Sequence, residues 1–88
     1  MAKVTLYTSD ACPYCIRAKR MLDAKGVEYD QVHLALWDAE ARIRLSEITG
    51  RRTVPQILVG ETPLGGYDDI KALDDAGRLD DLLGVATA

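Results

Sequence analysis

This 88-residue chain has no excess of basic residues, no long apolar runs and only two cysteines, and each of these features argues against a class of protein. The formal net charge is −3, which argues against nucleic-acid binding, because that binding depends on neutralising phosphates. No apolar run reaches the length of a membrane span, and the opening "MAKVTLYTSD" lacks the apolar core of a secretory signal. Two cysteines are too few for the disulfide framework of a small secreted protein. We therefore expect a cytoplasmic protein that binds neither membranes nor nucleic acid.

The order of apolar and polar residues predicts alternating strands and helices in a single domain over residues 1–88. Alternating or short apolar segments predict strands over residues 3–8, 27–34, 55–59 and 62–64. Helical spacing and capping residues predict helices over residues 13–25, 39–49, from 68 onward and over 79–83. A helical crossover makes two strands parallel, and a two-residue turn makes the last pair antiparallel. The predicted fold is α/β, a mixed four-stranded sheet in the order β-α-β-α-β-β-α-α.

The same spacing predicts which side chains are buried. The second helix is expected to bury three apolar residues on one face: Ala41, Leu45 and Ile48. Tyr29 and Trp37 are expected to pack against the rest of the domain. Ile16 falls off the apolar stripe of its helix, beside the cysteines, so it is expected to be exposed and to contact protein substrates.

The only cysteines, Cys12 and Cys15, lie in the segment "SDACPYCIRAKRML" and allow three interpretations. A structural disulfide would close a loop of about four residues and gain roughly 2 kcal/mol, which a reducing compartment would cancel. A zinc site needs four ligands, and the chain adds only His33, which falls within a predicted strand. The third interpretation is a redox-active pair.

The residues between the cysteines favour the redox interpretation. Proline is preferred at the first position of a helix, so Pro13 places Cys12 at the N-cap and Cys15 one turn further in. The Cys12 sulfur would then face the free N–H groups of the first turn, from Tyr14 or Cys15. Because a thiolate is the attacking species in thiol chemistry, N–H groups that stabilise it would activate Cys12.

Beyond the pair itself, five segments at their separations resemble the glutaredoxin family, specifically its small dithiol members with a Cys-Pro-Tyr-Cys motif. These segments are "VTLYT", "CPYC", "GRRTVPQI", "GGYDD" and "LDDLL", and they cover nearly the whole chain. The resemblance implies a thioredoxin-like fold, glutathione as the reducing co-substrate, and no bound metal. It further implies protein disulfides and glutathionylated proteins as substrates, and we expect the chain to act as a monomer.

The resemblance also implies roles for individual residues. Cys12 corresponds to the family's nucleophile and Cys15 to its resolving thiol, and the peptide bond before Pro55 is cis in the family. The residues that correspond to the glutathione site are Tyr14, Arg51, Thr53, Val54, Pro55, Gly66, Asp68 and Asp69. Backbone groups of Val54 would pair with the cysteinyl part of glutathione, and the helix start at residues 68–69 would bind its γ-glutamyl end.

One departure from the family concerns a lysine that commonly precedes the first cysteine and contacts the glycyl carboxylate. This chain has "TSDAC" at that place, with no basic residue. Arg51 or Arg52 is suited to replace the lysine, because a guanidinium group matches a carboxylate in geometry.

Two other functions remain open from the sequence. One is a redoxin that is reduced by thioredoxin reductase, although the "GGYDD" segment is not expected in that class. The other is an iron–sulfur carrier, in which Cys12 from two chains and two glutathiones hold a cluster. Pro13 stiffens the motif and is unusual in such carriers.

Overall fold

The structure is a computed structural model that describes residues 3–84, so both ends of the predicted domain lie outside the described residues. Along the chain it contains β1 (Val4–Ser9), α1 (Pro13–Ala24), β2 (Tyr29–Leu34), α2 (Ala39–Thr49), β3 (Gln56–Val59), β4 (Thr62–Gly65), α3 (Tyr67–Asp75) and α4 (Leu79–Leu83). This order of elements is the one that the sequence predicts. The boundaries differ by one or two residues; α3, for example, begins at Tyr67 rather than at residue 68.

The strands form one mixed sheet in the order β2-β1-β3-β4. β1 runs parallel to β2, and β3 runs antiparallel to β4, as predicted. β3 runs antiparallel to β1, whereas the rule that a helical connection makes strands parallel predicts the opposite direction. The rule fails here because β2 and β3, which α2 connects, are not neighbours in the sheet. Ser9 pairs in register with Leu34 at the end of the parallel pair, and Thr8 pairs with His33. The loops that follow β1 and β2 therefore leave the sheet at the same edge, which is the edge that carries the cysteines.

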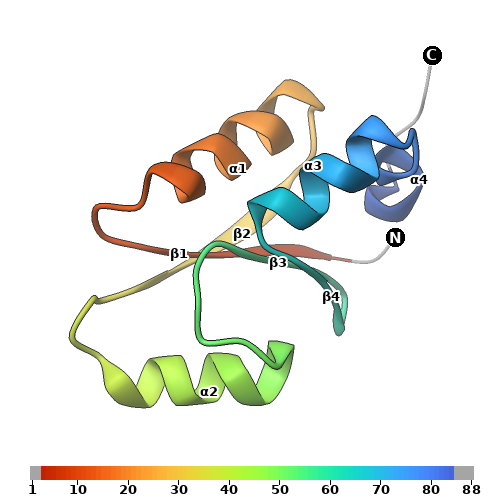
Figure 1. Cartoon of the computed structure of the whole chain (residues 1–88). Coiled ribbons are helices and arrows are strands. Elements are labelled where there is room, and N and C mark those ends of the chain that lie inside the picture. Colours follow the sequence, from red (N-terminus) through yellow and green to blue (C-terminus); the bar gives the residue numbers. More distant parts are fainter. Residues whose placement is uncertain (1–2, 85–88) are drawn as a thin grey trace.

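Helices cover both faces of the sheet, with α1, α3 and α4 on one side and α2 on the other (Figure 1). Val4 and Leu6 belong to the larger apolar cluster, together with residues of α1, α3 and α4. Tyr7 packs instead against the smaller cluster beneath α2. Because successive side chains of a strand point to opposite faces, Thr8 lies on the same face as Leu6, the face that α1 covers.

The structure corrects two of the predicted packing positions. Ile48 is 48% exposed, because the buried cluster beneath α2 reaches only to Leu45 and Ile48 lies one turn beyond it. Trp37 is 85% exposed, because it lies in the loop after β2, where neither face of the sheet holds it. The other four positions agree with the structure: Ala41 and Leu45 are buried, Tyr29 packs against the larger cluster, and Ile16 is 54% exposed. The contact of Ile16 with protein substrates stays a prediction.

Candidate active site

The disulfide between Cys12 and Cys15 lies at the start of α1, directly after the loop that follows β1. Pro13 is the first helical residue, so Cys12 is the N-cap, as the sequence predicts. The N–H of Cys15 donates a hydrogen bond to the Sγ atom of Cys12 over 3.1 Å. The Cα atoms of the two cysteines are 5.2 Å apart. A thiolate at Cys12 in the reduced protein would therefore have a donor already in place.

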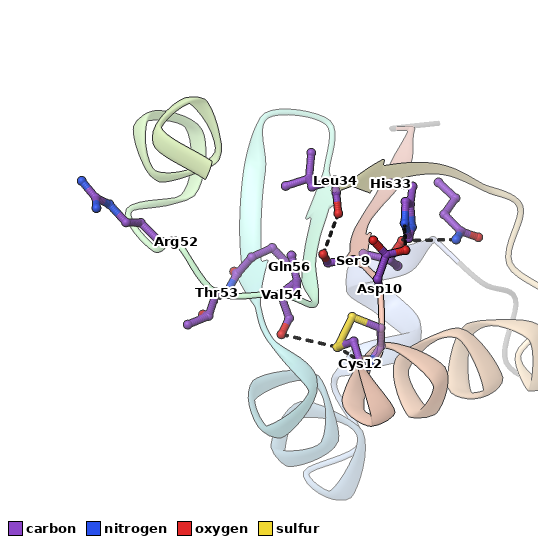
Figure 2. Close-up of a disulfide and its surroundings, with 12 residues drawn as sticks. Ser9, Asp10, Cys12, His33, Leu34, Arg52, Thr53, Val54 and Gln56 are labelled. Atoms are coloured by element: carbon purple, nitrogen blue, oxygen red, sulfur yellow. Dashed lines mark hydrogen bonds and ion pairs between the residues drawn. A yellow bond between two sulfur atoms is a disulfide. The ribbon is translucent and has the colours of Figure 1, made fainter. Parts of the chain in front are cut away.

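The two cysteines differ in their surroundings. Cys12 is half-buried, whereas Cys15 is 5% exposed on the inner side of α1. The carbonyl oxygen of Val54 lies 3.8 Å from the Sγ atom of Cys12 (Figure 2). The peptide bond between Val54 and Pro55 is cis, which confirms that prediction. A substrate that reaches Cys12 consequently also reaches the backbone of Val54.

We expect the reduced protein to be alkylated first at Cys12. Cys12 is accessible and its sulfur accepts an N–H, whereas Cys15 is buried against the helix. Mass spectrometry after a brief exposure of the reduced chain to iodoacetamide should therefore find at least about tenfold more label on Cys12 than on Cys15. Equal labelling of both residues would contradict the difference in access, and denatured protein, which should label both, is the control.

A groove of about 180 Å³ extends beside Cys12, and all the residues of the predicted glutathione site line it. Its lining comes from the start of α1, the segment before β3 and the start of α3, and consists of Tyr14, Arg51, Thr53, Val54, Pro55, Gln56, Gly66, Tyr67, Asp68 and Asp69. The sequence therefore predicted which residues meet here, although the segments are far apart along the chain.

Aromatic rings form one wall of this groove. The ring centroids of Tyr14 and Tyr67 are 6.1 Å apart with their planes tilted by 36°. The guanidinium group of Arg17 lies 5.3 Å from the centre of the Tyr14 ring, within the range of a cation–π contact. Tyr14 is thus held between two partners although its side chain is largely exposed.

The start of α3 forms the opposite end of the groove. The Oδ2 atom of Asp69 accepts hydrogen bonds from the N–H of Gly66 over 2.9 Å and from Nη1 of Arg51 over 2.7 Å. The Gly66 N–H, followed by the Arg51 guanidinium, lowers the pKa of the Asp69 carboxyl below its usual value. Gly65 has a φ of 108°, and a Cβ atom there would overlap the Asp69 side chain. A residue without a side chain is therefore required where β4 meets α3.

The two arginines before Thr53 have different positions. Arg51 lines the groove and pairs with Asp69. Arg52 lies outside the set of lining residues, and its side chain points away from the disulfide (Figure 2). The carbonyl oxygen of Arg52 accepts a hydrogen bond from Arg42 over 3.1 Å. Of the two replacements considered for the missing lysine, only Arg51 lies in the groove.

Two residues of the groove were missed by the sequence reasoning, Gln56 and Tyr67. Gln56 is 1% exposed, and its Nε2 donates to Oγ1 of Thr53 over 3.2 Å. Its Oε1 atom has no hydrogen-bond partner among residues 3–84. A glutamine inside the apolar segment "PQILV" was the available signal, because a buried amide in such a segment usually has a specific partner.

A second groove, of about 350 Å³, is lined by both cysteines together with a set of residues that the first groove does not contain. The lining includes Thr8, Asp10, Ile16, Lys19, Gln31 and His33, and the side chains of Tyr14 and Asp69 are not among it. Within residues 3–84, no group of three or more His, Cys, Asp and Glu side chains is placed to hold a metal ion. Over the same range, no helix is long and apolar enough to cross a membrane.

A Cys-x-x-Cys disulfide at a helix start, beside a cis-proline on a four-stranded mixed sheet, defines a dithiol redox protein with a thioredoxin-like fold. The family model described as Glutaredoxin matches residues 4–63. The chain is 48% identical over 83 residues to a glutaredoxin of Pseudomonas aeruginosa, an alignment that covers 94% of this chain and 98% of that protein. It is 45% identical to glutaredoxin 3 of Escherichia coli strain K12, with 94% and 99% covered.

Solved structures agree with these relatives. The chain superposes on a crystal structure of a buckwheat glutaredoxin–glutathione complex with a TM-score of 0.82 and 27% identity, covering 94% of this chain and 77% of that chain. The chain belongs to the glutaredoxin family, and it is a dithiol thiol–disulfide oxidoreductase.

Proposed function

We propose that this oxidoreductase uses glutathione to reduce protein disulfides and protein–glutathione mixed disulfides, with Cys12 as the nucleophile. The observation that carries the proposal is the position of the Cys12 sulfur, which accepts an N–H at the helix start and faces the Val54 carbonyl at the groove. The buckwheat relative was solved with glutathione, which supports glutathione as the occupant of this groove.

The proposed chemistry has a common first step. The Cys12 thiolate attacks one sulfur of the substrate disulfide, a new disulfide forms at Cys12, and the other substrate sulfur leaves as a thiolate. When Cys12 carries glutathione, a second glutathione attacks that sulfur and releases oxidised glutathione. When Cys12 carries a protein, Cys15 attacks Cys12 and the reduced protein leaves. Two glutathiones then reduce the Cys12–Cys15 disulfide.

The groove has groups that match glutathione from end to end. Glutathione carries two carboxylates and one ammonium group at neutral pH. The Val54 backbone would pair with its cysteinyl unit as an added strand would. The first N–H groups of α3, at Asp68 and Asp69, would receive the γ-glutamyl carboxylate. The Asp69 carboxylate would receive the ammonium, and Arg51 would receive the glycyl carboxylate.

Binding in this way requires Arg51 and Asp69 to exchange partners, because they form an ion pair in this structure. The Arg51 and Asp69 side chains are 54% and 39% exposed, and an exposed pair contributes only about 0.2–1 kcal/mol. Glutathione offers each of them a group of opposite charge, so neither charge is left unpaired when the pair opens. Opening the pair is therefore a small cost of binding.

Replacing Arg51 by alanine should lower kcat/KM for glutathione by up to about fivefold, which is the range of an exposed ion pair. Replacing Arg52 removes the same charge one residue away, but from a side chain that does not line the groove and points away from the disulfide (Figure 2). The matched control Arg52→Ala should therefore change kcat/KM less than twofold, by roughly the scatter of neutral surface substitutions. Equal losses in the two variants would mean that general charge, and not a contact of Arg51, attracts glutathione.

The experiment that tests the proposed function couples reduction of one small mixed disulfide to two reductants in parallel. We expect turnover with glutathione and glutathione reductase, and little or none with thioredoxin reductase alone. Turnover with thioredoxin reductase alone would instead indicate a redoxin of the other class. Absorbance of protein purified without air would reveal a bound cluster, which the proposal does not include.

We further propose that the chain acts as a monomer in the cytoplasm, over a single domain of residues 1–88. The cysteine pair and every residue proposed to bind glutathione belong to the same chain, so the proposed reaction needs no second copy. A pair of cysteines that works by cycling between thiols and disulfide suits a compartment with a glutathione pool. Sedimentation of the reduced and oxidised protein tests the monomer, with a dimer in either state as the contrary outcome.

A further inference from the structure

The second groove contains a chain of hydrogen bonds that the reaction described above does not use. His33, on β2, has its Nε2 atom 2.7 Å from Oδ1 of Asp10 and its Nδ1 atom 3.3 Å from Oγ1 of Thr8. The Nε2 amide of Gln31 donates to the same Thr8 hydroxyl over 3.2 Å. Figure 2 shows Asp10 and His33 close to the disulfide, and the Val54 carbonyl approaching it from another side.

The direction of each hydrogen bond follows from what its groups can donate. An ionised carboxylate only accepts, so the proton of a neutral His33 ring lies on Nε2 and is donated to Asp10. Nδ1 is then an acceptor, and the Thr8 hydroxyl is the donor that faces it. Gln31 donates to Thr8 and thereby leaves the Thr8 proton free to point at His33. The hydrogen bonds are thus oriented to carry a proton from Thr8 through His33 toward Asp10.

Thr8, a member of this hydrogen-bond network, shares the second groove with the resolving cysteine. Thr8 is 4% exposed and lies on the sheet face that α1 covers, and it lines the same groove as Cys15. Cys15 does not line the glutathione groove. Of the two grooves described within residues 3–84, the one that Cys15 lines is therefore the one that contains Thr8, Asp10 and His33.

Cys15 must lose its proton before it can attack, since the thiolate is the reactive form. The ionisable side chains that line the groove with His33 are Asp10 from the loop after β1, Cys12 at the N-cap of α1, and Cys15 and Lys19 from α1. An ammonium group only donates. A reference imidazole titrates roughly 2 pKa units below a thiol and a carboxylate more than 4 below, so an imidazole is the better matched acceptor.

We infer that Thr8, His33 and Asp10 form a proton relay that accepts the proton of Cys15 during resolution of a protein mixed disulfide. The Cys15 proton passes to the Thr8 oxygen, and the Thr8 proton passes to Nδ1 of His33, whose new positive charge faces the Asp10 carboxylate. The Cys15 sulfur bonds to Cys12, and the bond between Cys12 and the substrate sulfur breaks. The substrate leaves as a thiolate with the electron pair and is protonated by the relay or by solvent. The inference rests on the proposed role of Cys15.

The test separates the two thiol steps in a single turnover. The reduced protein is mixed with an excess of an aromatic disulfide that releases a coloured thiolate. The attack of Cys12 releases one thiolate at a rate that rises with disulfide concentration. The attack of Cys15 releases a second at a rate that does not. No glutathione is present, so failure of the glutathione proposal leaves this measurement intact.

We expect His33→Ala to slow the second release by about tenfold relative to the first. This effect is smaller than the rate loss usual for a positioned acid–base group, because solvent reaches this groove and can also accept the proton. Added imidazole should restore the second release, and the same concentration of sodium chloride should not. Thr8→Val should slow this step as well, and Thr8→Ser, which keeps a hydroxyl, should not. Gln31→Ala should slow this step less than His33→Ala does, because Gln31 orients the Thr8 hydroxyl but lies outside the proton path.

Three results would overturn the relay. They are an unchanged second release in His33→Ala, a loss in Gln31→Ala as large as that in His33→Ala, and no recovery with imidazole. The role of Cys15 is tested separately by Cys15→Ser, which should release one thiolate only. Two thiolates from Cys15→Ser would overturn the proposed function of Cys15 itself.

Discussion

Cys12→Ser should abolish turnover with every disulfide substrate and reduce the rate to the uncatalysed background. Cys12 is the half-buried residue whose sulfur faces both the helix start and the Val54 carbonyl, whereas Cys15 is 5% exposed. A serine hydroxyl at this place stays protonated and cannot exchange with a disulfide. The measurement is reduction of a glutathione mixed disulfide and of a protein disulfide by the same preparation.

Cys15→Ser is the matched variant, because it also removes one sulfur but from the inner position. Deglutathionylation should persist in it, since glutathione itself resolves the adduct on Cys12. Reduction of protein disulfides should fall to a small fraction of the parent rate. Activity of Cys12→Ser with either substrate, or loss of both activities in Cys15→Ser, would mean that the two roles have been assigned wrongly.

Asp69→Ala should lower kcat/KM for glutathione by roughly five- to thirtyfold, the effect of losing about 1–2 kcal/mol from a charged hydrogen bond in a partly buried place. This is the largest effect that we expect outside the cysteines, because Asp69 would hold the only ammonium group of the ligand. The measurement is the steady-state rate over a range of glutathione concentrations.

Asp69→Asn separates binding from folding in this experiment. Asparagine keeps an acceptor for the Gly66 N–H but loses the negative charge. If the charge holds the ammonium, kcat/KM for Asp69→Asn should fall nearly as far as for Asp69→Ala. If Asp69 only caps α3, Asp69→Asn should match the parent, and the assignment of the ammonium would be wrong.

The difference in stability between the parent protein and Asp69→Asn should depend on pH. The Gly66 N–H and Arg51 lower the pKa of the Asp69 carboxyl in the folded state. A lowered folded-state pKa means that the charged form stabilises the fold above the unfolded-state value, and that this contribution is lost as the pH falls through the lowered value. The Tm advantage of the parent over Asp69→Asn should therefore be constant near neutral pH and shrink in acid.

The sequence predicted those features that depend on neighbouring residues or on strong local patterns. Pro13 fixes where α1 begins, and that alone places Cys12 at the N-cap. The alternation in β1 and the apolar faces of the helices predict the order of strands and helices along the chain, and the two-residue turn predicts the antiparallel pairing of β3 and β4. The resemblance to a known family supplied the residues of the first groove, which no local rule would have brought together.

The sequence could not predict contacts that depend on strand register or on the direction of long side chains. Asp10 and His33 are 23 residues apart and meet only because β1 pairs with β2 in one particular register. Arg51 and Arg52 are adjacent and have the same side chain, and the direction of the backbone determines that only Arg51 reaches Asp69. Trp37 was misplaced because periodicity describes residues within helices and strands, and this residue belongs to neither.

The exposed position of Trp37 determines what an optical measurement on this protein reports. It is the only tryptophan in the chain, so the indole emission comes from a ring that is already 85% in water in the folded state. Unfolding changes the surroundings of such a ring very little, and a melting curve followed by tryptophan emission would be nearly flat even when the core is lost. Circular dichroism of the backbone is the probe that can establish whether variants such as Thr8→Val are folded.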